Sequence, residues 1–174
     1  MNEDFRLFPY VIRDIVSQVR TKYDSVNLLK PYFEFGTYFE LTKRIAIKDS
    51  IDAGKYPLIW LVWEAVESMQ KWNNSHSYLV NPRVFICNFT NTDFSSVERY
   101  DSNFVGVLFP IFDLFKYYLQ YDNFISGSGE IKYQLAEHLL WGESLGFQKN
   151  QNILFDTLDA IEVKFENLEV NKRC

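Results

Sequence analysis

The sequence predicts an α+β domain in which a mostly antiparallel sheet packs against an N-terminal helix and a central helix. Three features lead to this prediction. Residues 4–24 repeat apolar side chains at helical spacing, residues 56–63 and 84–89 are short continuous apolar runs, and residues 161–165 alternate between apolar and polar side chains. Repeats of three to four residues are typical of amphipathic helices, whereas short apolar runs and strict alternation are typical of strands.

The N-terminal segment, about residues 4–24, is predicted to be an amphipathic helix. Its apolar side chains follow one another at steps of one, three and four residues, at Phe5, Phe8, Ile12, Ile15, Val16, Val19 and Tyr23. Pro31 prevents a continuation of that helix, and residues 32–36 have the alternation and closing glycine of a short strand or turn. From Phe39 onward the apolar spacing mixes two and four, and we assign a helix that ends at Gly54.

Two apolar runs are predicted to be buried strands. The first, residues 56–63, is bounded by turn formers and polar residues, and we expect it to be a central strand that is buried on both faces. The second run covers residues 84–89. The polar residues between the two runs predict a flexible loop at about residues 70–78.

A long helix is predicted to begin at Ser95. Ser95 and Glu98 have the spacing of a capping box, in which the serine accepts a hydrogen bond from an early backbone amide and the glutamate reaches back to the cap. An apolar helical stripe continues to about Tyr121. Pro110 interrupts this stripe, so we expect a kink there or the first turn of a new helix.

The C-terminal third is predicted to contain two strands. Residues 131–135 alternate as a strand does, and a flexible loop is expected at about residues 142–153. Residues 161–165 alternate as well, with their polar neighbours facing the other way. Because the apolar positions resume with the opposite parity at Leu168, the pattern predicts a bulge at Asn167.

Composition and charge narrow the classes of function. The 174 residues are 47% hydrophobic and 24% charged, which predicts one folded domain over residues 1–174. A net charge of −5 without a basic run argues against a general affinity for nucleic-acid phosphates. The first residues are acidic and no apolar run approaches the length of a membrane span, so we expect neither export nor membrane insertion.

Aromatic side chains are more abundant than a core of this size requires. Sixteen Phe, eleven Tyr and four Trp make up 18% of the chain. We therefore expect some of the rings to lie at the surface, because aromatic side chains dominate the buried centres of protein interfaces. For any single ring, a place in the core is an equally good interpretation.

Few residues could carry chemistry. His76 and His138 lack a second histidine at the spacing of a metal site, so no metal and no other cofactor is predicted. The apolar neighbours of Cys87 favour an inert core thiol over a nucleophile. Asp156 and Asp159 could bind a cation or share a proton, but carboxylates directly before a strand more commonly cap a turn. We therefore predict that the protein is not an enzyme.

An ordered series of motifs resembles a family of virion proteins. The series consists of Tyr56-Pro-Leu-Ile-Trp-Leu61, Val84-Phe-Ile-Cys-Asn-Phe-Thr90, Glu98-Arg-Tyr100, Leu108-Phe-Pro-Ile111 and Phe155-Asp-Thr-Leu-Asp-Ala-Ile-Glu162. Over about residues 30–170 the chain is similar to the tail-completion or tail-terminator proteins of tailed phages of Bacteroidetes, including the crAss-like phages. These motifs are stretches of scaffold, not a catalytic signature.

The resemblance implies a small, tail-terminator-like α+β fold and a structural role. Such proteins form a closed ring in the neck or tail, which implies six- or twelve-fold self-assembly, contacts with portal, neck or tail proteins, and a channel for DNA as transiting cargo. It also implies a place in the virion after assembly in the cytoplasm of the bacterial host. A closed ring requires two different complementary patches on each subunit. The candidate aromatic residues for these patches are Trp60, Trp63, Trp72, Trp141 and Phe147.

Two other classes of function remain as alternatives. A cytosolic enzyme or small-molecule-binding protein could build its site from residues that are distant in the sequence. A protein-binding module could instead hold one partner through its aromatic side chains while remaining a monomer. Converging polar groups in a deep pocket would favour the first alternative, and a lone exposed groove would favour the second.

Overall fold

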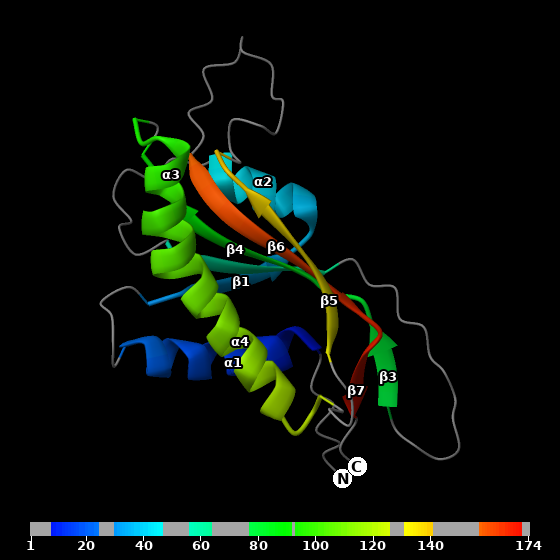
Figure 1. The fold of residues 1–174 in the computed structure, drawn as a ribbon. Coiled ribbons are helices and arrows are strands. Elements are labelled where there is room, and N and C mark those ends of the chain that lie inside the picture. Colours follow the sequence, from blue (N-terminus) through cyan, green and yellow to red (C-terminus); the bar gives the residue numbers. More distant parts are fainter. Residues whose placement is uncertain are drawn as a thin grey trace.

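The computed structural model describes residues 8–24, 30–46, 56–63, 77–91, 93–125, 131–140 and 157–171. They form the α+β architecture that the sequence predicts (Figure 1). A five-stranded sheet has the order β1 (Tyr32–Gly36), β2 (Leu58–Val62), β4 (Arg83–Phe89), β6 (Leu158–Glu166) and β5 (Lys132–His138). Neighbouring strands are antiparallel except β1 and β2, which are parallel, so the sheet is mostly antiparallel, as predicted.

One face of this sheet is covered by two helical segments. They are α1 (Phe8–Asp24) and a long rod made of α3 (Ser96–Arg99), η1 (Tyr100–Leu108) and α4 (Phe109–Tyr121), which crosses the sheet diagonally in Figure 1. The main core lies between these helices and the sheet and includes Ile15, Phe115, Ile86 and Val163, none of which is exposed to solvent. The N-terminal and central helices therefore pack on the sheet as expected.

The opposite face carries a smaller apolar cluster beneath α2 (Tyr38–Ala46). Leu41 of α2 meets Trp60 of β2 and Phe85 of β4 in this cluster. Gly36 precedes the helix, and a Cβ atom at this position would lie 2.6 Å from Glu40 Oε2 and 3.1 Å from the Trp60 ring. A side chain at Gly36 would therefore displace the Glu40 carboxylate and crowd the Trp60 ring.

The predicted buried strands are confirmed. All five residues of β2 are buried, and β2 lies inside the sheet between β1 and β4. The run from Val84 to Cys87 in β4 is also fully buried. A strand with helices over both faces buries consecutive residues, which explains why these segments are continuously apolar.

Both early helices lie where the sequence predicts them. The first was predicted for about residues 4–24, and α1 covers Phe8–Asp24, with residues 4–7 outside the described part. The second was predicted from Phe39 to Gly54, and α2 covers Tyr38–Ala46, with residues 47–54 outside it. Thr37 and Glu40 form a capping box at the start of α2, because Glu40 Oε2 accepts from the Thr37 amide at 2.7 Å and Glu40 N donates to Thr37 Oγ1 at 3.2 Å.

The capping box predicted at Ser95 is present. Glu98 N donates to Ser95 Oγ at 3.3 Å, and Ser95 N donates to Glu98 Oε2 at 2.8 Å. The hydrogen bonds from Ser95 hold the pKa of Glu98 below its ordinary value of 4.5. Since the folded-state pKa is the lower one, this contact stabilises the fold above pH 4.5 and is lost as the pH falls through the folded-state pKa.

Replacing Ser95 by alanine is expected to lower the free energy of unfolding by about 1 kcal/mol at neutral pH. The variant loses the side-chain acceptor for the Glu98 amide. Urea denaturation followed by circular dichroism measures the difference; the part that comes from the Ser95 hydroxyl donating to Glu98 Oε2 at 2.8 Å should be lost as the pH falls through the lowered pKa of Glu98. Ser96→Ala is the matched control, because this exposed serine is the next residue and does not supply the cap. A Ser95→Ala variant as stable as Ser96→Ala would contradict the capping role.

Pro110 lies in the first turn of α4, one of the two outcomes predicted for it. The preceding segment, η1, is a π-helix of nine residues that runs into α4 without a break in the rod. This wider helix was not predicted, because an apolar stripe does not distinguish one helical hydrogen-bonding pattern from another. Such π-helical segments occur frequently at functional sites.

Two predictions about loops and strand ends are wrong in detail. The loop expected at residues 70–78 does not include its last two residues, because β3 (Ser77–Val80) begins at Ser77, while residues 70–76 lie outside the described part. Asn167 is not a bulge within one strand. It has a φ of 51° where the chain leaves β6, and β7 (Leu168–Asn171) then pairs with β3 in a separate two-stranded sheet. The change of parity marks a change of sheet.

The remaining strand and loop predictions have separate outcomes. The strand predicted at residues 131–135 is confirmed as β5. The loop predicted at about residues 142–153 lies outside the described residues. The single domain predicted for residues 1–174 remains a prediction.

Candidate functional site

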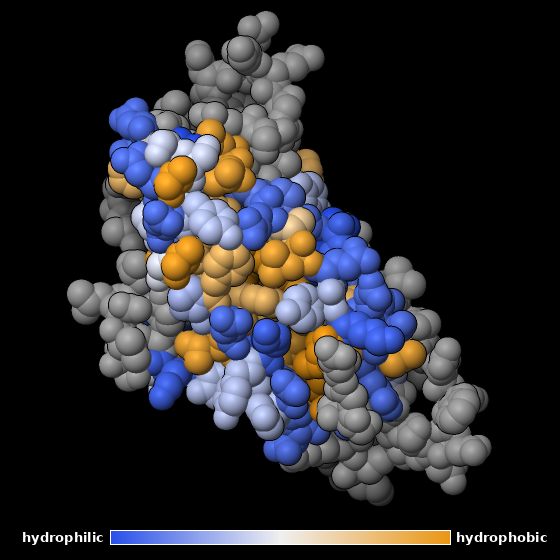
Figure 2. Space-filling view, viewed as in Figure 1, coloured by the Kyte–Doolittle hydropathy of each residue, from blue (hydrophilic) through white to orange (hydrophobic). Residues whose placement is uncertain are grey.

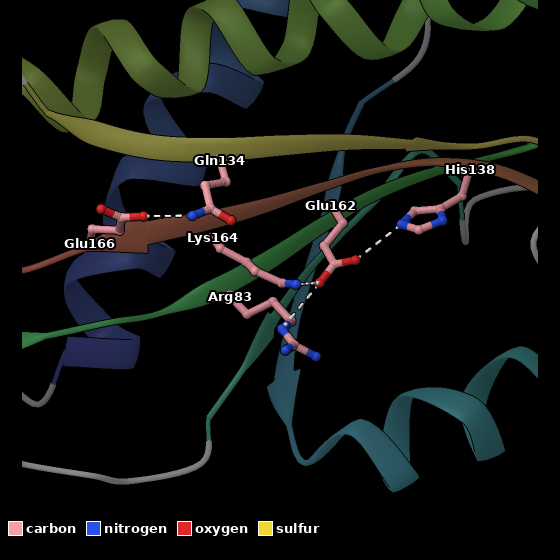
Figure 3. Close-up of polar contacts among 6 residues, drawn as sticks. All are labelled: Arg83, Gln134, His138, Glu162, Lys164 and Glu166. Carbon is pink, nitrogen blue, oxygen red and sulfur yellow. Dashed lines mark hydrogen bonds and ion pairs between the residues drawn. The ribbon is translucent and has the colours of Figure 1, made fainter.

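The most chemically diverse group of described side chains surrounds Glu162 of β6. Its Oε1 lies 3.2 Å from Arg83 Nε and 3.3 Å from Lys164 Nζ, and its Oε2 lies 3.0 Å from His138 Nε2. Figure 3 shows these side chains projecting to the same side of the sheet as α2 and away from α4. Gln134 and Glu166 extend the row with a hydrogen bond of 2.8 Å.

Strand register explains why these residues meet. In β6, Lys164 stands between Arg83 of β4 on one side and Gln134 of β5 on the other. Residues of β4 and β5 therefore flank β6 on the same face of the sheet. Glu162 was predicted to face away from the core with its polar neighbours, yet it is only 9% exposed. Alternation indicates the face on which a side chain lies, but it does not indicate what covers that face.

This cluster joins three strands through the Glu162 carboxylate. Both carboxylate oxygens of Glu162 already have partners, Arg83 and Lys164 at Oε1 and His138 at Oε2. His138 Nε2 donates to Glu162 when that nitrogen carries the proton. The partner side chains of Glu162 are 30% to 46% exposed, so each of these contacts contributes a modest amount, on the order of 1 kcal/mol or less.

Asp159 belongs to a second polar group, buried on the helix side of the sheet. The Nδ2 of Asn103 in η1 donates to Asp159 Oδ2 at 2.8 Å and to Phe89 O at 3.2 Å. Asn88 donates to Asn103 Oδ1 at 2.7 Å, and the Leu140 amide donates to Asp159 Oδ1 at 3.2 Å. This network ties the π-helix to β4 and β6, because a buried polar group is costly unless it is hydrogen-bonded.

The predicted role of Asp159 as a turn cap is wrong. Asp159 lies inside β6 with no exposed surface, and its partners come from η1 and from the turn after β5. Asp156, its proposed companion, lies outside the described residues, so the pair itself is not tested. Within the described ranges, no group of three or more His, Cys, Asp or Glu side chains could hold a metal ion.

Cys87 is a core residue, as predicted. Its side chain is fully buried in the cluster beneath α2, and burial raises the pKa of its thiol far above the ordinary value. A thiol that stays protonated at neutral pH is a poor nucleophile. Core packing is therefore the role that the structure supports for this cysteine.

The five candidate interface aromatics differ in position. Trp60 is only 4% exposed and packs in the cluster beneath α2, so its choice as a surface residue is wrong: its large apolar ring fills the core of its own chain. Trp63 is partly buried, and its ring stacks on Phe8 with centroids 5.6 Å apart. Trp72, Trp141 and Phe147 lie outside the described residues.

Other aromatic side chains do lie at the surface, as the composition predicts. Their exposed fractions range from 37% to 67% among Tyr10, Tyr32, Phe35, Phe39, Phe89, Phe94, Tyr100, Tyr117, Tyr121 and Tyr133. In the space-filling view, hydrophobic residues reach the surface between α4 and β5 (Figure 2). The sequence could count the surplus rings but could not tell which ones the fold would leave exposed.

The five-stranded sheet ends in two different open edges. β1 forms one edge and β5 the other, and neither outer edge pairs with a further strand in the described part of the chain. Six of the seven residues of β5 are exposed. An open edge presents backbone donors and acceptors to which another chain can add a strand.

No protein-family model, curated protein or solved structure matches this chain. The described helices include none that is long and apolar enough to cross a membrane. The described part of the chain thus has two polar clusters that connect elements of the fold, and two open sheet edges with aromatic side chains beside them.

Proposed function

We propose that this protein is a structural subunit of a homo-oligomeric ring in the neck or tail of a tailed bacteriophage. The ring joins the portal side of the head to the tail and leaves a channel through which DNA passes. Its contacts are with copies of itself and with neighbouring neck, tail or portal proteins. The protein acts without a cofactor or catalysis, and its place is in the virion after assembly in the host cytoplasm.

The observation that supports this proposal best is the pair of unlike open edges, β1 and β5, at opposite ends of one sheet. Subunits of a closed ring contact one another through two different patches, and each patch must fit the other and not itself. The two edges differ in sequence and in length, as the two patches of a ring subunit must. A catalytic function would instead need polar groups that remain available to a substrate.

The ordered motifs that resemble tail-terminator proteins coincide with scaffold elements. The apolar motifs starting at Tyr56 and Val84 form β2 and β4, and the motif that ends at Glu162 runs into β6. They build the inner strands, so they support a shared fold more directly than a shared surface. The acidic net charge of −5 is compatible with a channel lining that does not retain DNA.

The purified protein is expected to form six- or twelve-fold rings, alone at high concentration or with its virion neighbours. Native mass spectrometry gives the stoichiometry, and negative-stain electron microscopy shows ring closure. Replacing Leu135 of β5 by lysine should weaken the assembly at least about tenfold, because a charge on an open edge opposes strand addition. Leu135 is 37% exposed, so the folded subunit tolerates the change.

Val97→Lys is the matched control. Val97 is 70% exposed on α3, far from either sheet edge in sequence, and its substitution should leave the assembly unchanged. A protein that stays monomeric at every concentration and binds no virion protein would contradict the proposed function. Equal effects of the two lysine substitutions would show that the assembly does not use the β5 edge.

A further inference from the structure

The two open edges of the sheet are complementary to each other, and we propose that β5 of one copy adds to β1 of the next copy as an antiparallel strand. This inference rests on the proposed ring and names the contact that closes it. The occupant of the β1 edge is thus a second copy of this chain. The sheet would then continue from subunit to subunit around the ring.

The apolar side chains of the two strands lie on the same face of the sheet. On β1, Phe33 packs against the main core, and the Phe35 ring lies 6.4 Å from Tyr10 of α1. On β5, Tyr133 stands opposite Phe165, a residue of the same core, and Leu135 follows two positions later on the same side. Residues that stand directly opposite each other on neighbouring strands point to the same face of the sheet. If the apolar residues of β5 stand opposite Phe33 and Phe35, apolar side chains therefore meet apolar side chains where the two copies join.

These side chains have apolar surface left to bury. Phe35 is 44% exposed, while Tyr133 and Leu135 are each 37% exposed. An antiparallel register that sets Leu135 opposite Phe33 also sets Tyr133 opposite Phe35. Both pairs would bury apolar surface that each monomer leaves in water, and cross-strand pairs of this kind stabilise sheets.

A groove beside β1 offers room and charge for the incoming strand. The groove has a volume of about 340 Å³ and lies between α1 and the start of β1, with Arg13 and Arg20 on one side and Tyr32 and Phe33 on the other. Arg20 forms no ion pair with any residue of the described ranges. The groove therefore presents a guanidinium group beside the open edge.

Glu137 of β5 is the matching charge. It is exposed, and within the described chain it too forms no ion pair. Its parity places it on the same face as Leu135, which is the α1 side of the sheet. In the register with Leu135 opposite Phe33, Glu137 would reach the position of Pro31, at the groove that Arg20 lines.

The position of α1 selects the direction of the added strand. Tyr10 lies near Phe35 at the end of β1, whereas Arg20 lies near Tyr32 at its start, so α1 and β1 run in opposite directions. Only an antiparallel β5 brings Glu137 to Arg20 while its apolar residues face those of β1. A parallel β5 would place Glu137 near Tyr10 and away from the arginine.

Cysteine cross-linking tests this register. Glu34 would stand opposite Gln134, so Glu34→Cys and Gln134→Cys are made separately in a Cys174→Ser background, where the remaining Cys87 is buried. The two variants are mixed and treated with a short thiol-reactive cross-linker, because facing residues lie about 5 Å apart. We expect a heterodimer by intact mass at more than about ten times the yield of a control mixture of Glu34→Cys with Tyr121→Cys on α4.

A charge exchange tests the Arg20–Glu137 contact. Arg20→Glu or Glu137→Arg alone should weaken self-association about fivefold or more, and the double variant should restore it, since exposed ion pairs are worth up to about 1 kcal/mol. Native mass spectrometry of the same samples gives the oligomeric state. If rings form but the cross-linked product between positions 34 and 134 does not exceed that of the control mixture, the pairing of the two edges is wrong and the proposed ring still stands. A monomer that gives no product would overturn both.

Cross-linking in assembled particles tests whether a second copy of this chain, and not another virion protein, occupies the β1 edge. If the cysteine at position 34 cross-links to a different virion protein in assembled particles and not to position 134, the edge serves another partner and the inference is wrong. Cross-linking to position 134 both in the purified protein and in particles supports the inference fully. Circular dichroism of each variant confirms that the substitutions leave the subunit folded.

Discussion

Replacing Asp159 by alanine is expected to lower the free energy of unfolding by about 3 kcal/mol, because two donors lose their acceptor at once. Asn103 Nδ2 and the Leu140 amide both donate to the Asp159 carboxyl group. Asp159 has no exposed surface and Asn103 is 7% exposed, so water would not easily replace the lost acceptor at the amide group. Urea denaturation monitored by far-UV circular dichroism measures the loss.

Two further variants make the Asp159 prediction specific. Asp159→Asn keeps one oxygen and should have an intermediate effect, since one donor then faces a second donor. Asp101→Ala removes an exposed aspartate from the same π-helix that carries Asn103, and it should change stability by less than about 0.5 kcal/mol. An Asp159→Ala variant as stable as Asp101→Ala would contradict the structural role of the network.

Local sequence signals predicted the helices and buried strands well. The spacing of Ser95 and Glu98 predicted a helix start that the structure confirms bond by bond. The same spacing occurs at Thr37 and Glu40, and applying it there would have set the start of α2 at Tyr38. Capping is a contact between residues three apart, so the information needed to predict it is contained in the local sequence.

Pairing between distant segments was less accessible to sequence reasoning. Alternation predicted β6 correctly, and the parity change at Asn167 was visible, but no local pattern indicates that β7 pairs with β3 in another sheet. The parallel pairing of β1 with β2 is likewise a long-range property. Such choices depend on which apolar faces the rest of the chain leaves uncovered.

For the candidate site too, the sequence predicted the kind of residue but not its place in the fold. Composition predicted exposed aromatic side chains, and the described surface has them, yet Trp60, selected from the sequence alone, belongs to the core. Core and interface both favour large apolar side chains, so composition alone does not separate them. The position of an edge strand such as β5 separates them, and that position is known only once all the strands are paired.

Phe165→Ala is expected to have the largest effect among the single substitutions, with a loss of about 4 kcal/mol in the free energy of unfolding. Phe165 is only 2% exposed, and its ring lies 6.2 Å, centroid to centroid, from both Phe115 of α4 and Tyr133 of β5. The substitution would leave a cavity and remove two aromatic contacts. Chemical denaturation measures the loss, with Phe89→Ala as the matched control because Phe89 is a strand residue that is 55% exposed.

The position of Phe165 gives this prediction a second, local readout. Tyr133 stands directly opposite Phe165, so the lost ring also loosens β5 at the edge of the sheet. Amide hydrogen exchange should therefore accelerate in β5 more than in β2, which lies on the far side of β4. Uniform acceleration across both strands would indicate global destabilisation alone. If β5 loosens selectively under conditions where the subunit remains folded, ring formation should weaken with it, because the proposed contact depends on a β5 edge that is already ordered.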